Sequence, residues 1–208
     1  MTFGFEREYF VRGNRDGKFV SASAAGLPCD GCGYLAEARG DFSTDINKAA
    51  ALLLAEERRL IKIAAQQNLG LVTLTPQKLD KTLLFESMRQ FGKSPQSDRS
   101  LSGKWNKSGV QHAGLHVHFG NQREIKYRQS GEGNHTTEHT IRVVDLFDIA
   151  EIIHALDKRY ALVIKMAGRA PGLYKLQPHG FEYRSLPSDI DPLEVADFIS
   201  TKGPGNWL

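Results

Sequence analysis

The sequence predicts an α+β fold in which a largely antiparallel sheet packs against two long helices. The chain has 208 residues, of which 40% are hydrophobic and 25% are charged, a composition typical of one soluble globular domain. Short segments rich in aromatic and β-branched residues alternate with turns that contain Gly, Asn or Pro, a pattern typical of hairpin strands. Neither an internal repeat nor a Pro/Gly-rich linker divides the sequence. We therefore expect a single domain over residues 1–208.

The expected strands begin at the amino terminus. Residues 2–11 are rich in aromatic side chains, which favour an extended backbone. A Gly- and Asn-containing turn follows at 12–17, and 19–22 is expected to return as the second strand of a hairpin. Further strands are expected at 34–39, 71–75, 114–119 and 181–185.

Two stretches carry apolar residues at the spacing of an amphipathic helix. The first begins after Thr44 or Asp45, either of which can cap it, and runs to about Asn68. The second spans 144–166, and a final short helix is expected to start at residue 191 or 192. We expect the two long helices to pack on one face of the sheet, which leaves the other face for a site.

Polar segments between these elements are expected to be loops. Residues 92–110 are rich in Ser, Gly and Lys. Residues 121–140 are expected to form a second loop, and its polar part, 128–140, is expected to be mobile or to act as a lid over the site. Residues 168–177 are expected to form a basic loop that carries Arg169 and Lys175.

Charge and hydropathy argue against two classes of partner. Lys and Arg total 27 against 24 Asp and Glu, and this formal net charge of +3 does not favour nucleic acid as a direct partner. No apolar run approaches the roughly 20 residues of a membrane span, so we expect no membrane partner. Charged residues at positions 6–8 interrupt any amino-terminal leader. The expected location is the cytoplasm.

Four of the expected strands carry two polar side chains at alternate positions: Glu6 with Glu8, Glu37 with Arg39, His116 with His118, and Glu182 with Arg184. Because side chains alternate between the faces of a strand, each pair lies on one face. Carboxylates with imidazoles form sites for hard divalent cations such as Mg²⁺ or Mn²⁺. Arginines add fork-shaped donors for phosphate oxygens. The combination predicts metal-assisted phosphoryl transfer from a nucleotide.

Three segments carry a family resemblance: Gly-Phe-Glu-Arg-Glu-Tyr-Phe at 4–10, Gly-Leu-His-Val-His-Phe-Gly at 114–120, and His-Gly-Phe-Glu-Tyr-Arg-Ser-Leu-Pro-Ser at 179–188. In this order they resemble the carboxylate–amine ligases of the glutamine synthetase-like fold, and most of all the phage-type COOH–NH2 ligase (amidoligase) branch. The resemblance implies an ATP-dependent ligase that uses Mg²⁺ or Mn²⁺ and joins a small-molecule or peptide carboxylate to an amine donor. It is compatible with an oligomer or a monomer, and with a phage-encoded protein in the host cytoplasm.

The resemblance also implies roles for individual residues. Metal binding is implied for Glu6, Glu8, Glu37, His116 and Glu182. Nucleotide contacts are implied for His118, Arg39, Arg169, Lys175 and Arg184. The residues expected to act on the transferring phosphoryl group are Glu8, Arg169 and Arg184. The chain departs from the family pattern in having fewer acidic residues between Glu37 and His116, which leaves two or three metal ions open.

The residues leave two other functions open. A zinc-dependent hydrolase or peptidase could use the same Glu/His face, or the segment His135-x-x-Glu138-His139, which needs a helix to bring both histidines together. A catalytically inactive binding module is the other. The Cys29-x-x-Cys32 pair is interpreted as two thiols at a tight turn, with half of a zinc site as its alternative.

Overall fold

Strand β1 (Thr2–Gly13) is the strand on which the sheet is assembled. The computed structural model describes residues 1–29, 33–74, 77–78, 99–100, 110–120, 122–130, 136–144, 146–178 and 180–202. Along its length β1 pairs antiparallel with four strands: β2 (Phe19–Val20), β3 (Ala36–Arg39), β4 (Leu69–Val72) and β8 (Leu115–Gly120). Segments far apart in the sequence therefore meet through one strand.

The sheet continues from β8 through three more strands, in the order β8-β12-β11-β6. These are β12 (Gly180–Tyr183), β11 (Leu173–Gln177) and β6 (Arg99–Ser100). Two separate ribbons join β5 (Gln77–Lys78) to β7 (Val110–Gln111) and β9 (Gln122–Ser130) to β10 (Thr136–Val144). Every pairing among the described strands is antiparallel, which confirms the predicted α+β fold with a largely antiparallel sheet.

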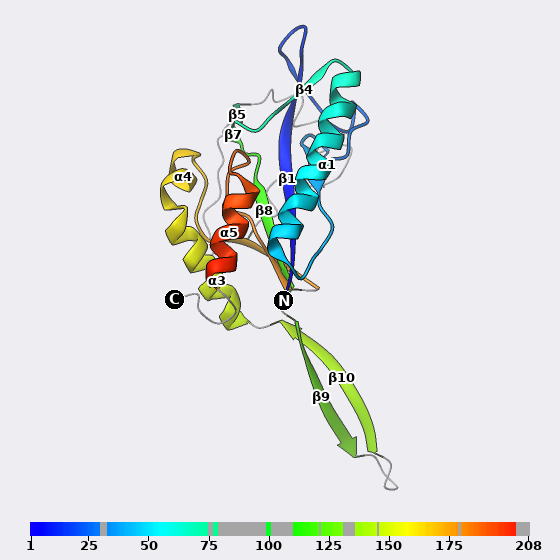
Figure 1. The fold of residues 1–208 in the computed structure, drawn as a ribbon, viewed down its shortest axis with the longest axis vertical. Coiled ribbons are helices and arrows are strands. Elements are labelled where there is room, and N and C mark those ends of the chain that lie inside the picture. Colours follow the sequence, from blue (N-terminus) through cyan, green and yellow to red (C-terminus); the bar gives the residue numbers. More distant parts are fainter. Residues whose placement is uncertain are drawn as a thin grey trace.

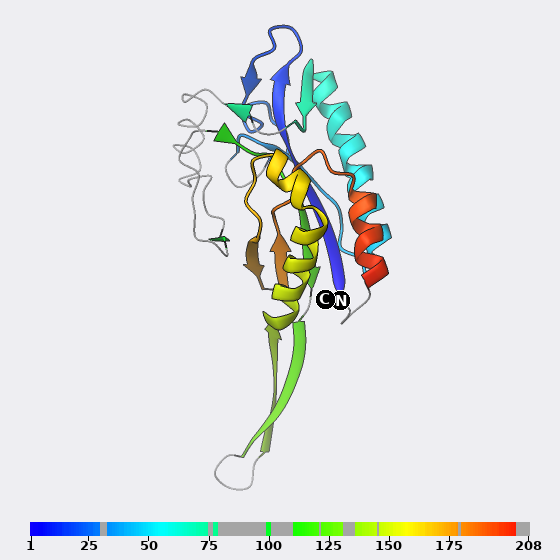
Figure 2. The same cartoon turned by 90° about the vertical axis from the view of Figure 1, so that its left-hand side faces the viewer.

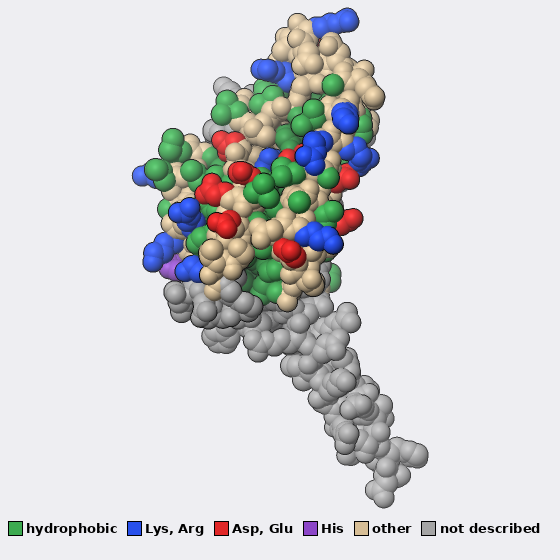
Figure 3. Space-filling view, in the orientation of Figure 1, with side chains coloured by type: hydrophobic (Ala, Val, Ile, Leu, Met, Phe, Trp, Pro, Cys, Tyr) green, Lys and Arg blue, Asp and Glu red, His purple; other side chains and the backbone are tan. Residues whose placement is uncertain are grey.

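The described residues form four helices: α1 (Ile46–Gln66), α3 (Leu146–Arg159), α4 (Ala161–Met166) and α5 (Pro192–Lys202). The Asp45 side chain caps α1 by accepting hydrogen bonds from the backbone N–H groups of Asn47 and Lys48. Figures 1 and 2 show α1 and α5 packed side by side along one side of the sheet. On this helix-covered face, side chains of both charges are interspersed with apolar ones (Figure 3).

The two faces of β1 differ in chemistry. Phe5 and Tyr9 enter the main core together with Leu53 of α1, because alternate residues of a strand share a face. Glu6 and Glu8 lie on the opposite face, and both are nevertheless buried. The helices thus take up the apolar face of the sheet and leave a buried polar face behind it.

Several predicted elements differ from the structure. Residues 122–130 and 136–140, which were expected within a loop, belong to the β9–β10 ribbon, and Figure 1 shows it projecting from the body. Strand β10 continues to Val144, where the second long helix was expected to begin. A strand of an isolated ribbon needs no core-facing row of apolar residues, so hydrophobic periodicity gives little signal for it. Residues 173–177 of the expected basic loop form strand β11. This strand was not predicted for the same reason: its residues are at most partly buried, so they show no clear row of apolar side chains.

The second long helix is divided. The expected helix over 144–166 forms α3 and α4, with a break at Tyr160, whose φ of −106° and ψ of 16° depart from helical values. Both sides of the break remain connected, because the Tyr160 N–H donates to Leu156 and the Tyr160 carbonyl accepts from Ile164. Most of the expected loop over 92–110 lies outside the described residues. No helix in the described ranges is both long and apolar enough to cross a bilayer.

A buried ion pair fastens the sheet to its helix layer. Arg7 of β1 and Glu57 of α1 are 3.1 Å apart, with side chains 11% and 8% exposed, and the Arg7 guanidinium also donates to the Ile190 carbonyl. Removing one partner leaves a buried charge unpaired.

We expect Glu57→Ala to lower the free energy of unfolding by about 3 kcal/mol, measured by urea denaturation. Arg59→Ala, which breaks an exposed pair with Glu56 on the same helix, is the matched control and should cost about 0.5 kcal/mol or less. Equal losses in the two variants would contradict a structural role for the buried pair.

Candidate metal centre

Neighbouring strands bring their paired polar residues together on the face of the sheet that lies away from the helices. In the register of β1, Glu6 lies opposite Arg39 of β3 on one side and opposite His116 of β8 on the other. Further along β8, His118 lies opposite Glu182 of β12. The alternation that predicted one face for each pair therefore also aligns residues from different strands.

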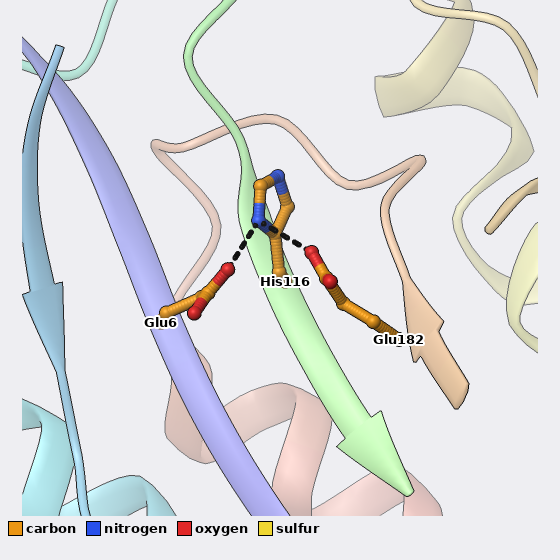
Figure 4. A group of neighbouring side chains, drawn as sticks. All are labelled: Glu6, His116 and Glu182. Carbon is orange, nitrogen blue, oxygen red and sulfur yellow. Dashed lines mark hydrogen bonds and ion pairs between the residues drawn. The ribbon is translucent and has the colours of Figure 1, made fainter. Parts of the chain in front are cut away.

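His116 lies between two carboxylates at the centre of this face (Figure 4). Its Nδ1 atom is 3.0 Å from Glu6 Oε1 and 3.1 Å from Glu182 Oε1. Its Nε2 atom is 3.6 Å from Glu8 Oε2, too far for a good hydrogen bond. Glu6, His116 and Glu182 each offer a ligand atom within 4.8 Å of the others, and all three residues are buried.

A glycine makes room for the imidazole. A Cβ atom at Gly114 would lie 2.6 Å from His116 Nε2 and 2.9 Å from an Arg169 nitrogen, closer than atoms of real side chains approach. The Gly114 N–H also donates to Glu8 Oε2 at 2.9 Å. Gly114 thus sets the positions of His116 and Glu8 together, a role that the sequence motif alone did not reveal.

The carboxylates stay ionised because cations adjoin them. Burial would raise the pKa of Glu6, but hydrogen bonds with His116 and His118 outweigh it and hold that pKa well below its ordinary value. Burial opposes ionisation of Glu182 in the same way, yet His116 and Arg184 lower its pKa to about 2. Both side chains are therefore acceptors at neutral pH.

The imidazole is the matching cation. Burial and the charge of Arg184 both lower the pKa of His116. They are outweighed by the surrounding carboxylates of Glu8, Glu182 and Glu6, which raise it to about 10. In the absence of metal, a proton on this ring therefore holds the carboxylates together at neutral pH.

Glu37 brings a second acid to the face. It lies directly opposite Glu8, so two like charges would adjoin across the strands. Burial, together with the charge of Glu6, raises the pKa of Glu37 to about 8. Arg39 moderates this repulsion: its guanidinium is 2.7 Å from Glu37 Oε1 and 2.8 Å from Glu6 Oε2, while its side chain remains 63% exposed.

Further side chains fix Glu182 and approach Glu8. Arg184 forms an ion pair with Glu182 and lies 3.9 Å from Glu8 Oε1. Gln177 of β11 donates to Glu182 Oε2 at 2.9 Å. Sequence reasoning missed Gln177 because it lies on a strand that was expected to be a loop.

An aromatic residue borders the site beside His118, whose Nε2 atom lies 3.2 Å from Glu6 Oε2. Phe42 meets the His118 ring edge-to-face, with centroids 5.7 Å apart, and 49% of Phe42 is exposed. Its ring lies over Gly4, where a Cβ atom would approach to 2.9 Å. Phe42 was also missed, because an isolated aromatic residue in a loop carries no motif.

The two residues of the expected basic loop lie in different surroundings. The Arg169 guanidinium donates to the backbone carbonyls of Ala113 (3.3 Å), Ser185 (3.0 Å) and Arg184. It therefore ties the segment before His116 to the end of β12. Lys175 lies on β11 directly opposite Glu182 and is exposed.

The donor set fits a divalent cation. Two carboxylates and one imidazole converge from three adjacent strands, and carboxylate oxygens with an imidazole nitrogen suit Mg²⁺, Mn²⁺ or Zn²⁺. The Nδ1 atom of His116 is the ring nitrogen that faces Glu6 and Glu182, and the buried Nε2 atom, which faces Glu8, has no hydrogen-bond partner among the described residues. Glu8 and Glu37 lie beside this set and could enlarge it.

Two other candidate motifs lie apart from this cluster. Glu138 and His139 are in strand β10, not in the helix that a zinc protease signature requires, and His135 lies outside the described residues. Cys29 forms an isolated bridge with Ala36 of β3, and Cys32 also lies outside the described residues.

Comparison of the chain with protein-family models, curated proteins and solved structures finds no match.

Metal binding should compete with the proton on His116. With a pKa of about 10 the metal-free imidazole is charged at neutral pH, so a metal that uses this ring must displace one proton. We expect the affinity for Mn²⁺ to rise about tenfold per pH unit between about pH 6 and pH 8, measured by calorimetric titration. His116→Gln should abolish most of the binding. A wild-type affinity that does not change with pH would contradict the assignment.

Gly114→Ala should weaken Mn²⁺ binding by about tenfold or more, because the added methyl group displaces the His116 ring. Gly26→Ala is the matched control: its Cβ meets nothing within 4 Å, although its φ of 66° makes alanine unfavourable there. The control should lose stability without losing metal affinity. Equal Mn²⁺ affinities in the two variants would contradict the role of Gly114.

Proposed function

We propose that the protein is an ATP- and Mg²⁺-dependent carboxylate–amine ligase that forms an amide through an acylphosphate. The observation that carries this proposal is the buried Glu6–His116–Glu182 cluster with arginines on either side. Metal ligands bordered by guanidinium groups suit the transfer of a phosphoryl group. Glu6, His116 and Glu182 come from the three motifs, at 4–10, 114–120 and 179–188, that resemble those of amidoligases. This resemblance also supports the ligase proposal.

The proposed roles follow the geometry of the face. Glu6, His116 and Glu182 would hold the divalent cation, which when bound neutralises charge on the phosphate oxygens. Arg184, whose guanidinium lies between Glu182 and Glu8, would donate to those oxygens. The Arg39 side chain is mostly exposed although it pairs with Glu6 and Glu37, so a ligand can reach it from the solvent.

Phe42 supports a nucleotide as the phosphoryl donor. Its half-exposed ring lies beside His118, at the border of the proposed metal site. An aromatic face offers a stacking surface for a planar base. We therefore assign the base of ATP to the side of the site where Phe42 lies.

The chain itself needs to supply little covalent chemistry. The substrate carboxylate oxygen attacks the γ-phosphorus and ADP leaves; the amine nitrogen then attacks the acyl carbon and inorganic phosphate leaves. The amine must also lose a proton. Burial and the charge of Glu6 raise the pKa of Glu37 in the metal-free protein, and in its ionised form this carboxylate would be the proton acceptor beside the cluster.

A zinc-dependent hydrolase built on the same Glu/His face is the alternative, because two carboxylates and one imidazole also suit Zn²⁺. The helical version of that alternative has no support, since Glu138 and His139 lie in a strand. An inactive binding module would need no metal, and the convergence of Glu6, His116 and Glu182 argues against it. Nucleotide binding that depends on Mg²⁺ separates the ligase from both alternatives.

The proposal is tested by calorimetric titration of a non-hydrolysable ATP analogue with and without Mg²⁺. Wild type should bind only with Mg²⁺, and Glu182→Gln and Glu8→Gln should each weaken binding by about tenfold or more. Glu194→Gln removes an exposed carboxylate on α5 and should bind like wild type.

Turnover is tested with ATP, a panel of carboxylates and hydroxylamine as a general amine. A hydroxamate formed together with ADP would identify the acylphosphate route. Absence of nucleotide binding by the wild type would overturn the ligase, and zinc retained after dialysis would then favour the hydrolase.

A further inference from the structure

The ribbon of β9 and β10 lies outside the site and carries unpaired strand edges. Its two nine-residue strands pair with each other and with no other strand in the described ranges. Figures 1 and 2 show it extending from the end of the body. At about 3.3 Å per residue each strand is about 30 Å long. An isolated two-stranded ribbon is marginally stable, and its edges can pair with another strand.

The two edges differ in sequence. Strand β9 carries charged residues at four of its nine positions, Arg123, Glu124, Lys126 and Arg128. Charge of this kind protects an edge from pairing. Strand β10, Thr-Thr-Glu-His-Thr-Ile-Arg-Val-Val, consists mostly of β-branched residues, which favour strand pairing. The β10 edge is therefore the one suited to receive a further strand.

We propose that this strand is β10 of a second copy of the chain, paired antiparallel about a twofold axis at Thr140. Thr140 is the central residue of Thr136–Val144, so all nine residues find a partner in this register. Glu138 and Arg142 lie two residues to either side of it. Each copy therefore places Glu138 opposite Arg142 of the other, and a twofold contact makes this pair twice.

The charge pattern extends across both ribbons. Within one ribbon, Glu138 lies opposite Arg128 and Arg142 lies opposite Glu124. In the proposed dimer each row therefore runs Arg128, Glu138, Arg142 and Glu124, with the last two from the second copy. Charge alternates in sign at every step, which favours this register over its neighbours. If the axis moved by one residue along β10, Glu138 and Arg142 of each copy would instead lie opposite uncharged residues of the other copy.

The intervening positions are also compatible. Within the ribbon, Ile125 lies opposite Ile141 and Tyr127 opposite His139. The proposed register places Ile141 opposite His139 of the second copy, so these rows join into one largely apolar set across four strands. A four-stranded sheet with such a set is more stable than a lone ribbon. The pairing leaves the metal centre on the body of each copy, so it is independent of the proposed ligase activity.

The test is sedimentation equilibrium of the full chain. Wild type should be a dimer, whereas Glu138→Arg alone and Arg142→Glu alone should each raise the dimer dissociation constant by about tenfold or more. Each variant then presents two like charges on its β10 edge. A mixture of the two variants restores both Glu–Arg pairs, so it should form a heterodimer with a dissociation constant near that of the wild type.

The double variant Glu124→Arg with Arg128→Glu is the matched control. It breaks the same pairs within the ribbon but leaves the β10 edge unchanged, so it should remain a dimer. A monomeric wild type, single variants that dimerise as tightly as the wild type, or a mixture that fails to associate would each overturn the proposal. A wild type that stays monomeric alone and sediments faster only with a DNA duplex would overturn it in favour of a nucleic-acid partner.

Discussion

The balance of charge around His116 is the constraint on which the site depends. Buried carboxylates are costly unless cations adjoin them. Here Glu6 and Glu182 are ionised because the His116 imidazole lies between them and Arg39 and Arg184 lie at the sides. In the metal-free protein the proton on His116 performs the task that a divalent cation would take over. The carboxylates are thus held close together before any cation binds, and the proton on His116 is the charge that a bound cation would displace.

Because side chains alternate along β1, its charged residues lie on one face of the sheet and its core residues lie on the other. Phe5 and Tyr9 face the helices, whereas Glu6 and Glu8 face the candidate metal site. The same strand therefore contributes to the hydrophobic core and to the site. The Arg7–Glu57 ion pair then fixes β1 against α1. Because the candidate ligands lie on strands packed against this core, their relative positions depend little on loops.

The chain also manages its strand edges differently in its two parts. Within the body β1 has partners along both of its edges, and β3 receives the Pro28–Cys29 segment through the hydrogen bond from the Glu37 N–H to the Pro28 carbonyl. The ribbon has no such cover from the described strands. Its β9 strand is rich in charged residues and its β10 strand is rich in β-branched residues, so sequence makes β10 the edge better suited to pairing.

The sequence by itself determined the alternation of polar and apolar residues in β1, β8 and β12. That alternation, together with apolar residues at helical spacing after a cap at Thr44 or Asp45, was enough to predict the α+β class, the first long helix and the single face shared by each polar pair. Only the tertiary structure decided which pairs meet, because strand register depends on contacts between distant segments. It also decided the roles of Gly114 and Gln177 and the form of 122–130 and 136–140, where no local period distinguishes a ribbon from a loop. Local periodicity indicates the face of a strand on which a side chain lies, whereas the packing of the whole chain determines which residue lies beside it.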